Sequence, residues 1–132
     1  MKQVKGWPPN INEIRASGLS HSEDTVFCYG DTMYTKSEQE IPEDVVFHEK
    51  IHSLQQKGRP DIWWQKYLIS PDFRLSQELE AFSRQYQMLK TKLPNKAMKE
   101  ALEEFAELLS SRYNIPITEV EAATLIRKYE TT

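Results

Sequence analysis

Residues 48–52 read HEKIH, and this short segment constrains the fold of the chain more than any other. Because a helix repeats every 3.6 residues, His48 and His52 project from the same face, and Glu49 leans over that face. Two neutral imidazoles at this spacing can hold one Zn²⁺, and the glutamate lies beside the water that completes the metal's shell. The pattern therefore predicts a helix that carries a zinc site.

The residues on either side of the motif favour the same helix. Pro42 suits its first turn, where Glu43 and Asp44 complement the positive end of the helix dipole. Gly58, directly after Lys57, is a typical stop signal.

This helix has two sides when its residues are spaced at about 100° each. The expected core side carries Phe47, Ile51 and Leu54. The expected chemical side carries Val45, His48, Glu49, His52 and Gln55.

A catalytic zinc ion normally takes a third protein ligand, and residues 71–90 offer two glutamates for this role. With Leu75 taken as zero and about 100° per residue, the apolar positions 79, 82, 86 and 89 lie within about 40° of it. On this scale Glu78 lies about 60° away and Glu80 about 140° away. A carboxylate held against a core is costly unless it is paired or bound to metal, so Glu78 is the predicted third ligand. Glu80 is expected to be a solvated charge and is the lesser candidate.

Other residues with potential chemistry have simpler interpretations. Cys28 lies in the apolar run TVFCY, which favours a small buried strand residue over a metal ligand. His21 lies in the polar stretch SGLSHSED, which favours a solvated loop. Trp63, Trp64 and Tyr67 have the spacing of a buried helical stripe, so core packing is favoured over a substrate-binding wall.

The remaining pattern predicts one α+β domain over residues 1–132 that is small and mostly helical. A short antiparallel hairpin or sheet is expected from residues 25 to 35, before the HEKIH helix, with its turn at Gly30-Asp31. Further helical segments are INEIRAS, IWWQKYL, PDFRLSQELEAFSRQYQMLK, KAMKEALEEFAELLSSRY and EVEAATLIRKY. Thr118 and Glu121 form a capping-box pattern for the last of these, and Pro94 marks a break between two others.

Charge and hydropathy exclude several classes of protein. The formal net charge is −3, with 17 basic and 20 acidic residues interspersed, which indicates neither a nucleic-acid partner nor an anionic membrane partner. No apolar run approaches the roughly 20 residues of a membrane span, and MKQVKGWPPN lacks the apolar stretch of a signal peptide. A single cysteine fits a reducing compartment. A cytoplasmic protein is therefore expected, and its oligomeric state stays open.

At these motifs the chain resembles the gluzincins, zinc peptidases that carry H-E-x-x-H on one helix and a glutamate ligand on the next. Their second motif, E-x-x-A, is matched at residues 78–81. The segments YGDTMY, IPEDVVFHEKIHSLQQ, WWQKYLISPDFRLSQELEAF and PITEVEAATLI are more closely similar to a family of short bacteriophage and prophage proteins predicted to be minimal gluzincin-like peptidases. This resemblance covers residues 10 to 127. Several zincins follow E-x-x-A with an aspartate that braces a ligand histidine, and Phe82 stands there instead.

The resemblance implies a zinc metallopeptidase with ligands His48, His52 and Glu78 and with Glu49 as general base, acting on a peptide or protein substrate. It also implies that a strand beside the active helix binds the substrate as an added strand, and residues 32–35 are the expected strand. The oxyanion donor is left open among His21, Tyr34 and Tyr86. Two alternatives are a non-catalytic zinc-binding phage accessory or structural protein, and a helical interaction module with an accidental motif.

Overall fold

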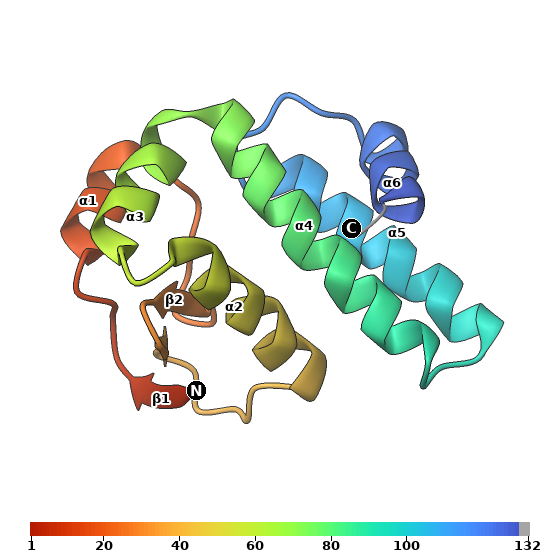
Figure 1. Cartoon of the computed structure of the whole chain (residues 1–132), viewed down its shortest axis with the longest axis horizontal. Coiled ribbons are helices and arrows are strands. Elements are labelled where there is room, and N and C mark those ends of the chain that lie inside the picture. The colour runs from red at the N-terminus through yellow and green to blue at the C-terminus, as the bar shows by residue number, and fades with distance from the viewer. Residues whose placement is uncertain (130–132) are drawn as a thin grey trace.

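The computed structural model describes residues 1–129 and confirms the expected α+β class: six helices accompany one small sheet (Figure 1). The elements in chain order are β1 (Lys2–Lys5), α1 (Ile11–Ser17), β2 (Phe27–Tyr29), β3 (Thr32–Thr35), α2 (Glu43–Gln56), α3 (Pro60–Ile69), α4 (Pro71–Lys90), α5 (Asn95–Ser111) and α6 (Glu119–Lys128). The sheet precedes the motif helix α2, as the sequence predicts.

The sheet is mixed, with the strand order β1-β3-β2. Strands β2 and β3 form the expected antiparallel hairpin, and Gly30 adopts the positive φ of 65° that its tight turn requires. Strand β1 pairs in parallel with β3 and was not expected, because all four of its residues are exposed and carry no buried stripe.

The position of β3 in the middle of the sheet overturns one expectation. Residues 32–35 pair with β1 on one side and with β2 on the other, so their backbone groups are not free to receive a substrate strand. The outer edges of this sheet belong to β1 and β2.

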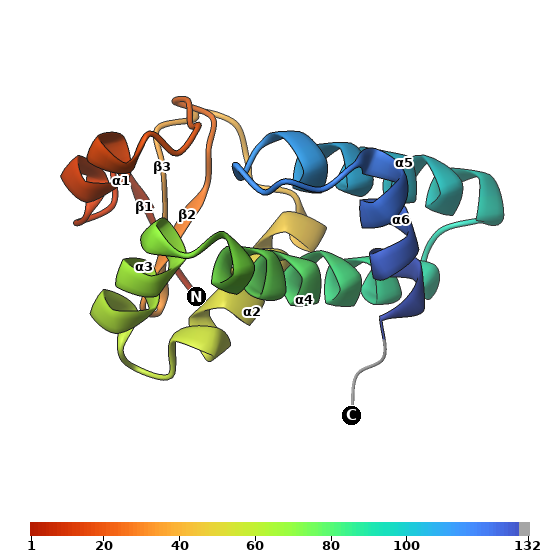
Figure 2. The same cartoon turned by 90° about the horizontal axis from the view of Figure 1, so that it is seen from above.

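Helix α2 packs between the hairpin strand β2 and helix α4 (Figure 2). The Gln56 side chain fastens its end to the hairpin, because the amide accepts a hydrogen bond from Gly30 N at 2.7 Å and donates one to the Cys28 carbonyl at 2.9 Å. These two bonds occupy the outer edge of β2 at residues 28–30 as a neighbouring strand would.

The two sides of α2 are buried differently from the sequence expectation. Ile51 is 2% exposed and Phe47 is half-buried, but Leu54 is 61% exposed, so its assignment to the core was wrong. His48, Glu49 and His52 on the chemical side are all buried. The reason is that α4 covers this side of α2, and helical periodicity identifies a side without showing which neighbour covers it.

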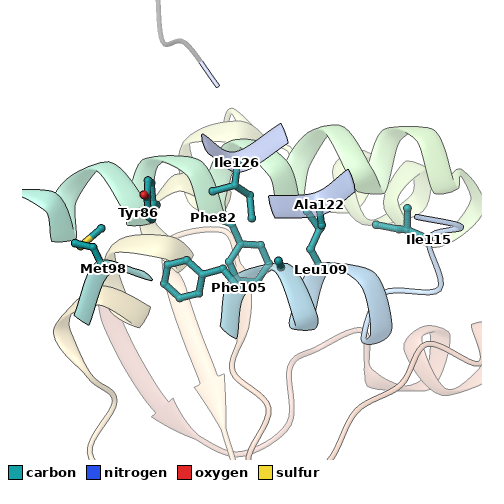
Figure 3. Close-up of a cluster of buried hydrophobic side chains, with 9 residues drawn as sticks. Phe82, Tyr86, Met98, Phe105, Leu109, Ile115, Ala122 and Ile126 are labelled. Atoms are coloured by element: carbon teal, nitrogen blue, oxygen red, sulfur yellow. The ribbon is translucent and has the colours of Figure 1, made fainter. Parts of the chain in front are cut away.

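Helices α4, α5 and α6 enclose the larger apolar core (Figure 3). Phe82 lies at its centre, with its ring centroid 5.4 Å from that of Phe105 on α5. Thr118 and Glu121 form the predicted capping box at the start of α6. The buried members of this core are Phe82, Tyr86, Met98, Phe105, Ala106, Leu109, Ile115, Ala122 and Ile126.

Helix α4 contacts α5 and α6 in the apolar core and also contacts α2, which explains how it carries both core and polar residues. Phe82 and Tyr86 pack into the apolar core with α5 and α6, whereas the buried polar residues Glu78 and Gln85 reach the histidines of α2. The site is therefore built on the contact between two helices, which favours a rigid geometry.

Helix α3 contributes the expected buried aromatic residues to a second, smaller apolar cluster. Trp63, Trp64 and Tyr67 are buried together with Ile14 of α1 and Phe27 of β2. Among residues 1–129, no helix combines the length and the apolar character that crossing a membrane demands.

Candidate metal centre

The structure brings His48, His52 and Glu78 together between α2 and α4. The Nε2 atoms of both histidines lie 3.1 Å from Oε1 of Glu78, and all three side chains are buried. One ligand atom from each residue lies within 4.8 Å of the other two, so the group can hold a metal ion. Glu80 is half-buried and does not belong to this group.

The donor set fits a zinc ion. Zn²⁺ prefers imidazole nitrogen and carboxylate oxygen at about 2.0–2.1 Å in tetrahedral geometry, which sets neighbouring ligand atoms about 3.3 Å apart. The two separations of 3.1 Å to Glu78 Oε1 are close to this value. Within the described residues the group offers three protein ligands and no fourth.

The second carboxylate oxygen of Glu78 has its own partner. The Tyr67 hydroxyl donates a hydrogen bond to Oε2, while Oε1 faces the two imidazoles. Tyr67 is held in turn by stacking on Trp63, with ring centroids 4.7 Å apart. The aromatic residues of α3 therefore pack the core and also orient the carboxylate.

Each histidine also has a glutamine partner at its other ring nitrogen. His48 Nδ1 lies 2.9 Å from Oε1 of Gln85, and His52 Nδ1 lies 2.7 Å from Oε1 of Gln55. A protonated Nδ1 donates to an amide oxygen, which leaves Nε2 directed toward the metal position. The two glutamines are therefore the partners that orient the two imidazole rings.

Glu49 lies beside the group without being one of its ligands. Its Oε2 is 3.9 Å from His48 Nε2, and the residue is 7% exposed. Burial raises the pKa of the Glu49 carboxyl, and the neighbouring His48 and His52 oppose this effect only in part. A carboxylate with a raised pKa beside a metal position has the properties of a general base.

The group opens into a cavity of about 440 Å³ that Glu49 also lines. This volume lies in the range of about 300–1,000 Å³ that is typical of small-molecule and cofactor sites. Phe27, the first residue of the edge strand β2, and the preceding residues Thr25 and Val26 form part of its lining. Much of the remaining lining is aromatic or apolar: Trp64, Phe82, Phe105, Leu108 and Tyr113.

Arg74 fixes the segment after α5 that closes this cavity. Its buried guanidinium donates hydrogen bonds to three backbone carbonyls, those of Tyr67, Tyr113 and Asn114. Asn114, three residues after the end of α5, has a positive φ of 53°. The backbone of Tyr113, which lies just after α5, is therefore held by a contact to α4.

Tyr113 lines the cavity close to the metal group. The centroid of its ring lies 6.0 Å from that of Phe82, and the Phe82 centroid lies 4.5 Å from that of the His48 ring. Burial, together with the negative charges of Glu78 and Glu49, raises the pKa of Tyr113 well above its ordinary value. The hydroxyl therefore stays protonated at neutral pH and can donate a hydrogen bond.

The other residues considered from the sequence lie outside the metal group. Cys28 is buried in β2, as expected, and burial raises the pKa of its thiol. His21 is half-buried, and its ring packs against Trp7 and Phe27, so the expectation of a solvated loop histidine was wrong. His21, Tyr34 and Tyr86 are all absent from the described lining of the cavity, which leaves Tyr113 as the tyrosine that sequence reasoning missed.

Two spacings in the sequence carried a signal for the missed residues. Gln85 follows Glu78 by seven residues, which is two helical turns, so both project toward α2. Asp44 precedes His48 by four residues and lies on the same side of its helix. No such signal exists for Tyr113, because it reaches the site from a separate segment of the chain.

The charges of the metal-free group depend on one another. Burial disfavours a charged imidazole, but Glu78, Glu49 and Gln55 together outweigh this effect and raise the pKa of His52 to about 9. Burial also disfavours the Glu78 carboxylate, but the two imidazoles hold its pKa well below the usual range. The metal-free group is therefore an imidazolium–carboxylate pair at neutral pH.

We expect zinc affinity to rise about tenfold per pH unit from pH 6.5 to about 9, because one proton must leave His52 for each ion that binds. The folding stability of the metal-free protein should instead fall as the pH rises through this window. A pKa raised by folding adds stability that is complete below the unfolded value of 6.5 and is lost as the pH rises to about 9. Competition with a chromophoric chelator and urea unfolding in EDTA measure the two trends. Zinc affinity that is flat across this window would contradict the ion pair.

The chain was also compared with known proteins. No family model, curated protein or solved structure matches it.

Proposed function

We propose that this protein is a zinc-dependent peptidase in which His48, His52 and Glu78 bind the metal ion and Glu49 is the general base. The observation that carries the proposal is the position of Glu49, a buried carboxylate that borders the ligand group and opens into the cavity. When bound, zinc supplies a Lewis acid that polarises a carbonyl group and makes water more acidic.

Proton transfer, stabilisation of the carbonyl oxygen and exclusion of water are assigned to residues of the protein. Glu49 accepts a proton from the attacking water and passes it to the leaving amine, a role for which its raised pKa is suited. Tyr113 donates its hydroxyl hydrogen to the carbonyl oxygen as negative charge develops there. The Trp64 and Phe105 side of the cavity excludes water from the reacting groups.

The substrate peptide is proposed to lie along the outer edge of β2. Phe27 of β2 and the preceding residues Thr25 and Val26 line the cavity, and β2 is an edge strand, so a bound extended peptide can add to the sheet there. The Gln56 amide occupies the same edge at Cys28 and Gly30 and so limits how far the peptide can extend.

A non-catalytic zinc protein is the main alternative, and it would need a different set of residues at the site. A structural zinc site is closed by a fourth protein ligand, and it has no use for a carboxylate that is not a ligand. The described group has three ligands, and Glu49 is buried at a cost that a purely structural site does not explain.

The test is to load the purified chain with zinc and incubate it with a broad peptide mixture, then to identify the products by mass spectrometry. We expect about one zinc ion per chain and cleavage that stops when a strong chelator removes the metal. Zinc retained at this ratio with no cleavage of any peptide would favour the accessory-protein alternative. A chain that takes up no zinc would exclude both.

A further inference from the structure

The two ligand histidines are braced by amides whose far ends contact carboxylates. Gln85 accepts from His48 through Oε1 and donates through Nε2 to Oδ2 of Asp44 at 2.8 Å. Gln55 accepts from His52 through Oε1 and donates through Nε2 to Oε1 of Glu80 at 2.8 Å. Both histidines therefore begin a chain of the form imidazole, amide, carboxylate.

Asp44 fixes the orientation of the Gln85 amide beside His48. An ionised carboxylate only accepts hydrogen bonds, so Asp44 requires the NH₂ end of the Gln85 amide to face it. The oxygen end then faces His48 Nδ1, which must carry the proton. The Nε2 lone pair is consequently left free on the side of Glu78, where a metal ion can accept it.

We propose that Asp44 and Gln85 are positioning residues that hold His48 in its metal-binding tautomer and set how strongly it binds zinc. The inference rests on the metal-binding part of the proposed function and not on the peptidase activity. Gln85 is 3% exposed, so water does not compete for its amide, and Asp44 is the one partner of its NH₂ group among the described residues.

The inner position of each chain determines how much electron density the imidazole supplies. A carboxylate that accepts the Nδ1 hydrogen raises the basicity of a ligand histidine, whereas a neutral amide orients the ring with less effect on basicity. Gln85 places the amide next to His48 and leaves the negative charge of Asp44 one side chain further out. This order favours a correctly oriented ligand of moderate strength.

The amide that contacts His52 has two hydrogen-bond acceptors, whereas the amide that contacts His48 has one among the described residues. The Gln55 amide donates to the backbone carbonyl of Gln77 at 2.9 Å as well as to Glu80. Its orientation is therefore set even without the carboxylate. Asp44 is consequently the outer carboxylate whose removal is expected to matter more.

The decisive experiment exchanges the carboxylate of Asp44 and the amide of Gln85. The double variant Asp44→Asn with Gln85→Glu keeps the net charge and the number of hydrogen bonds, but moves the carboxylate from the outer to the inner position. We expect its zinc affinity, measured by chelator competition, to be about tenfold higher than that of the parent chain. Asp44→Asn alone should lower the affinity about tenfold, because the Gln85 amide can then turn over and its NH₂ group favours the other tautomer of His48.

Glu43→Gln is the matched control. It removes one carboxylate from the same first turn of α2, where the Glu43 side chain is 79% exposed and pairs with Lys92. Zinc affinity should stay at the parent value in this variant. Nitrogen-15 chemical shifts of the His48 ring in the zinc-loaded protein report the tautomer directly, and they should show a protonated Nδ1 in the parent and in the exchanged double variant.

Two results would overturn the proposal. One is Asp44→Asn binding zinc as tightly as Glu43→Gln does. The other is the double variant binding zinc no more tightly than Asp44→Asn alone. Thermal unfolding of the metal-free variants establishes that each is folded. If the parent chain itself bound no zinc, the proposed function would fail instead, so the two failures are distinguishable.

Discussion

Replacing Glu78 by Gln is expected to weaken zinc binding by more than about 100-fold, since loss of a ligand should exceed the 10–100-fold cost of losing a residue that only supports one. The substitution keeps the size of the side chain but removes the negative charge that both imidazoles face at 3.1 Å. The buried group then loses the charge that offsets a divalent ion. Zinc retained after dialysis against a weak chelator, measured by elemental analysis, gives the result.

Glu80→Gln is the matched control for this prediction. Glu80 lies two residues away on the same helix and is half-buried, and its contacts are the Gln55 amide and the Tyr129 hydroxyl. Its loss should change zinc affinity by no more than a few-fold, because Gln77 still orients Gln55. If the Glu80 variant lost zinc and the Glu78 variant kept it, the assignment of the third ligand would be wrong.

The local parts of this site were predictable because helical spacing is a local property. The position of His48 relative to His52 follows from one turn of α2, and the choice of Glu78 over Glu80 follows from the angle between them on α4. Both inferences need only that each segment is helical. The structure brings His48, His52 and Glu78 together as those angles indicate.

The contacts that join separate segments were not predictable in the same way. Tyr113 lines the cavity from the segment after α5, where its carbonyl accepts a hydrogen bond from Arg74, a contact between residues 39 positions apart. Gln85 meets His48 across 37 positions. Periodicity indicates which side of a helix is polar, but the partner of that side depends on packing between helices, which a single sequence does not encode in any short pattern.

In the sheet, too, the contact between neighbouring segments was predictable and the contact between distant segments was not. The β2–β3 hairpin is a contact between neighbouring segments, and its turn at Gly30 is visible in the sequence. The pairing of β1 with β3 joins residues 2–5 to residues 32–35, and all four residues of β1 are exposed. With no alternating pattern in β1, nothing indicated that β3 would become the central strand and lose its free edge.

Glu49→Gln is expected to lower the rate of peptide hydrolysis by about 10²–10⁴-fold, the usual contribution of a general base. Zinc affinity should change little, because Glu49 is not one of the three ligands and its Oε2 lies 3.9 Å from His48 Nε2. Fold stability should not fall, because burial raises the pKa of the Glu49 carboxyl and an amide of the same shape avoids the cost of a buried charge. The measurements are kcat on a peptide cleaved by the parent chain, zinc content and urea unfolding.

Glu104→Gln provides the control for loss of negative charge from the same cavity. Glu104 lines the cavity from α5 but is exposed, so its carboxylate is solvated and has no assigned part in proton transfer. Hydrolysis by this variant should stay within about threefold of the parent rate, because solvated charges are screened over a short distance. Equal rates for Glu49→Gln and the parent chain would exclude Glu49 as the base. Equal losses in both variants would indicate that the charge of the cavity, rather than a proton acceptor at Glu49, supports the reaction.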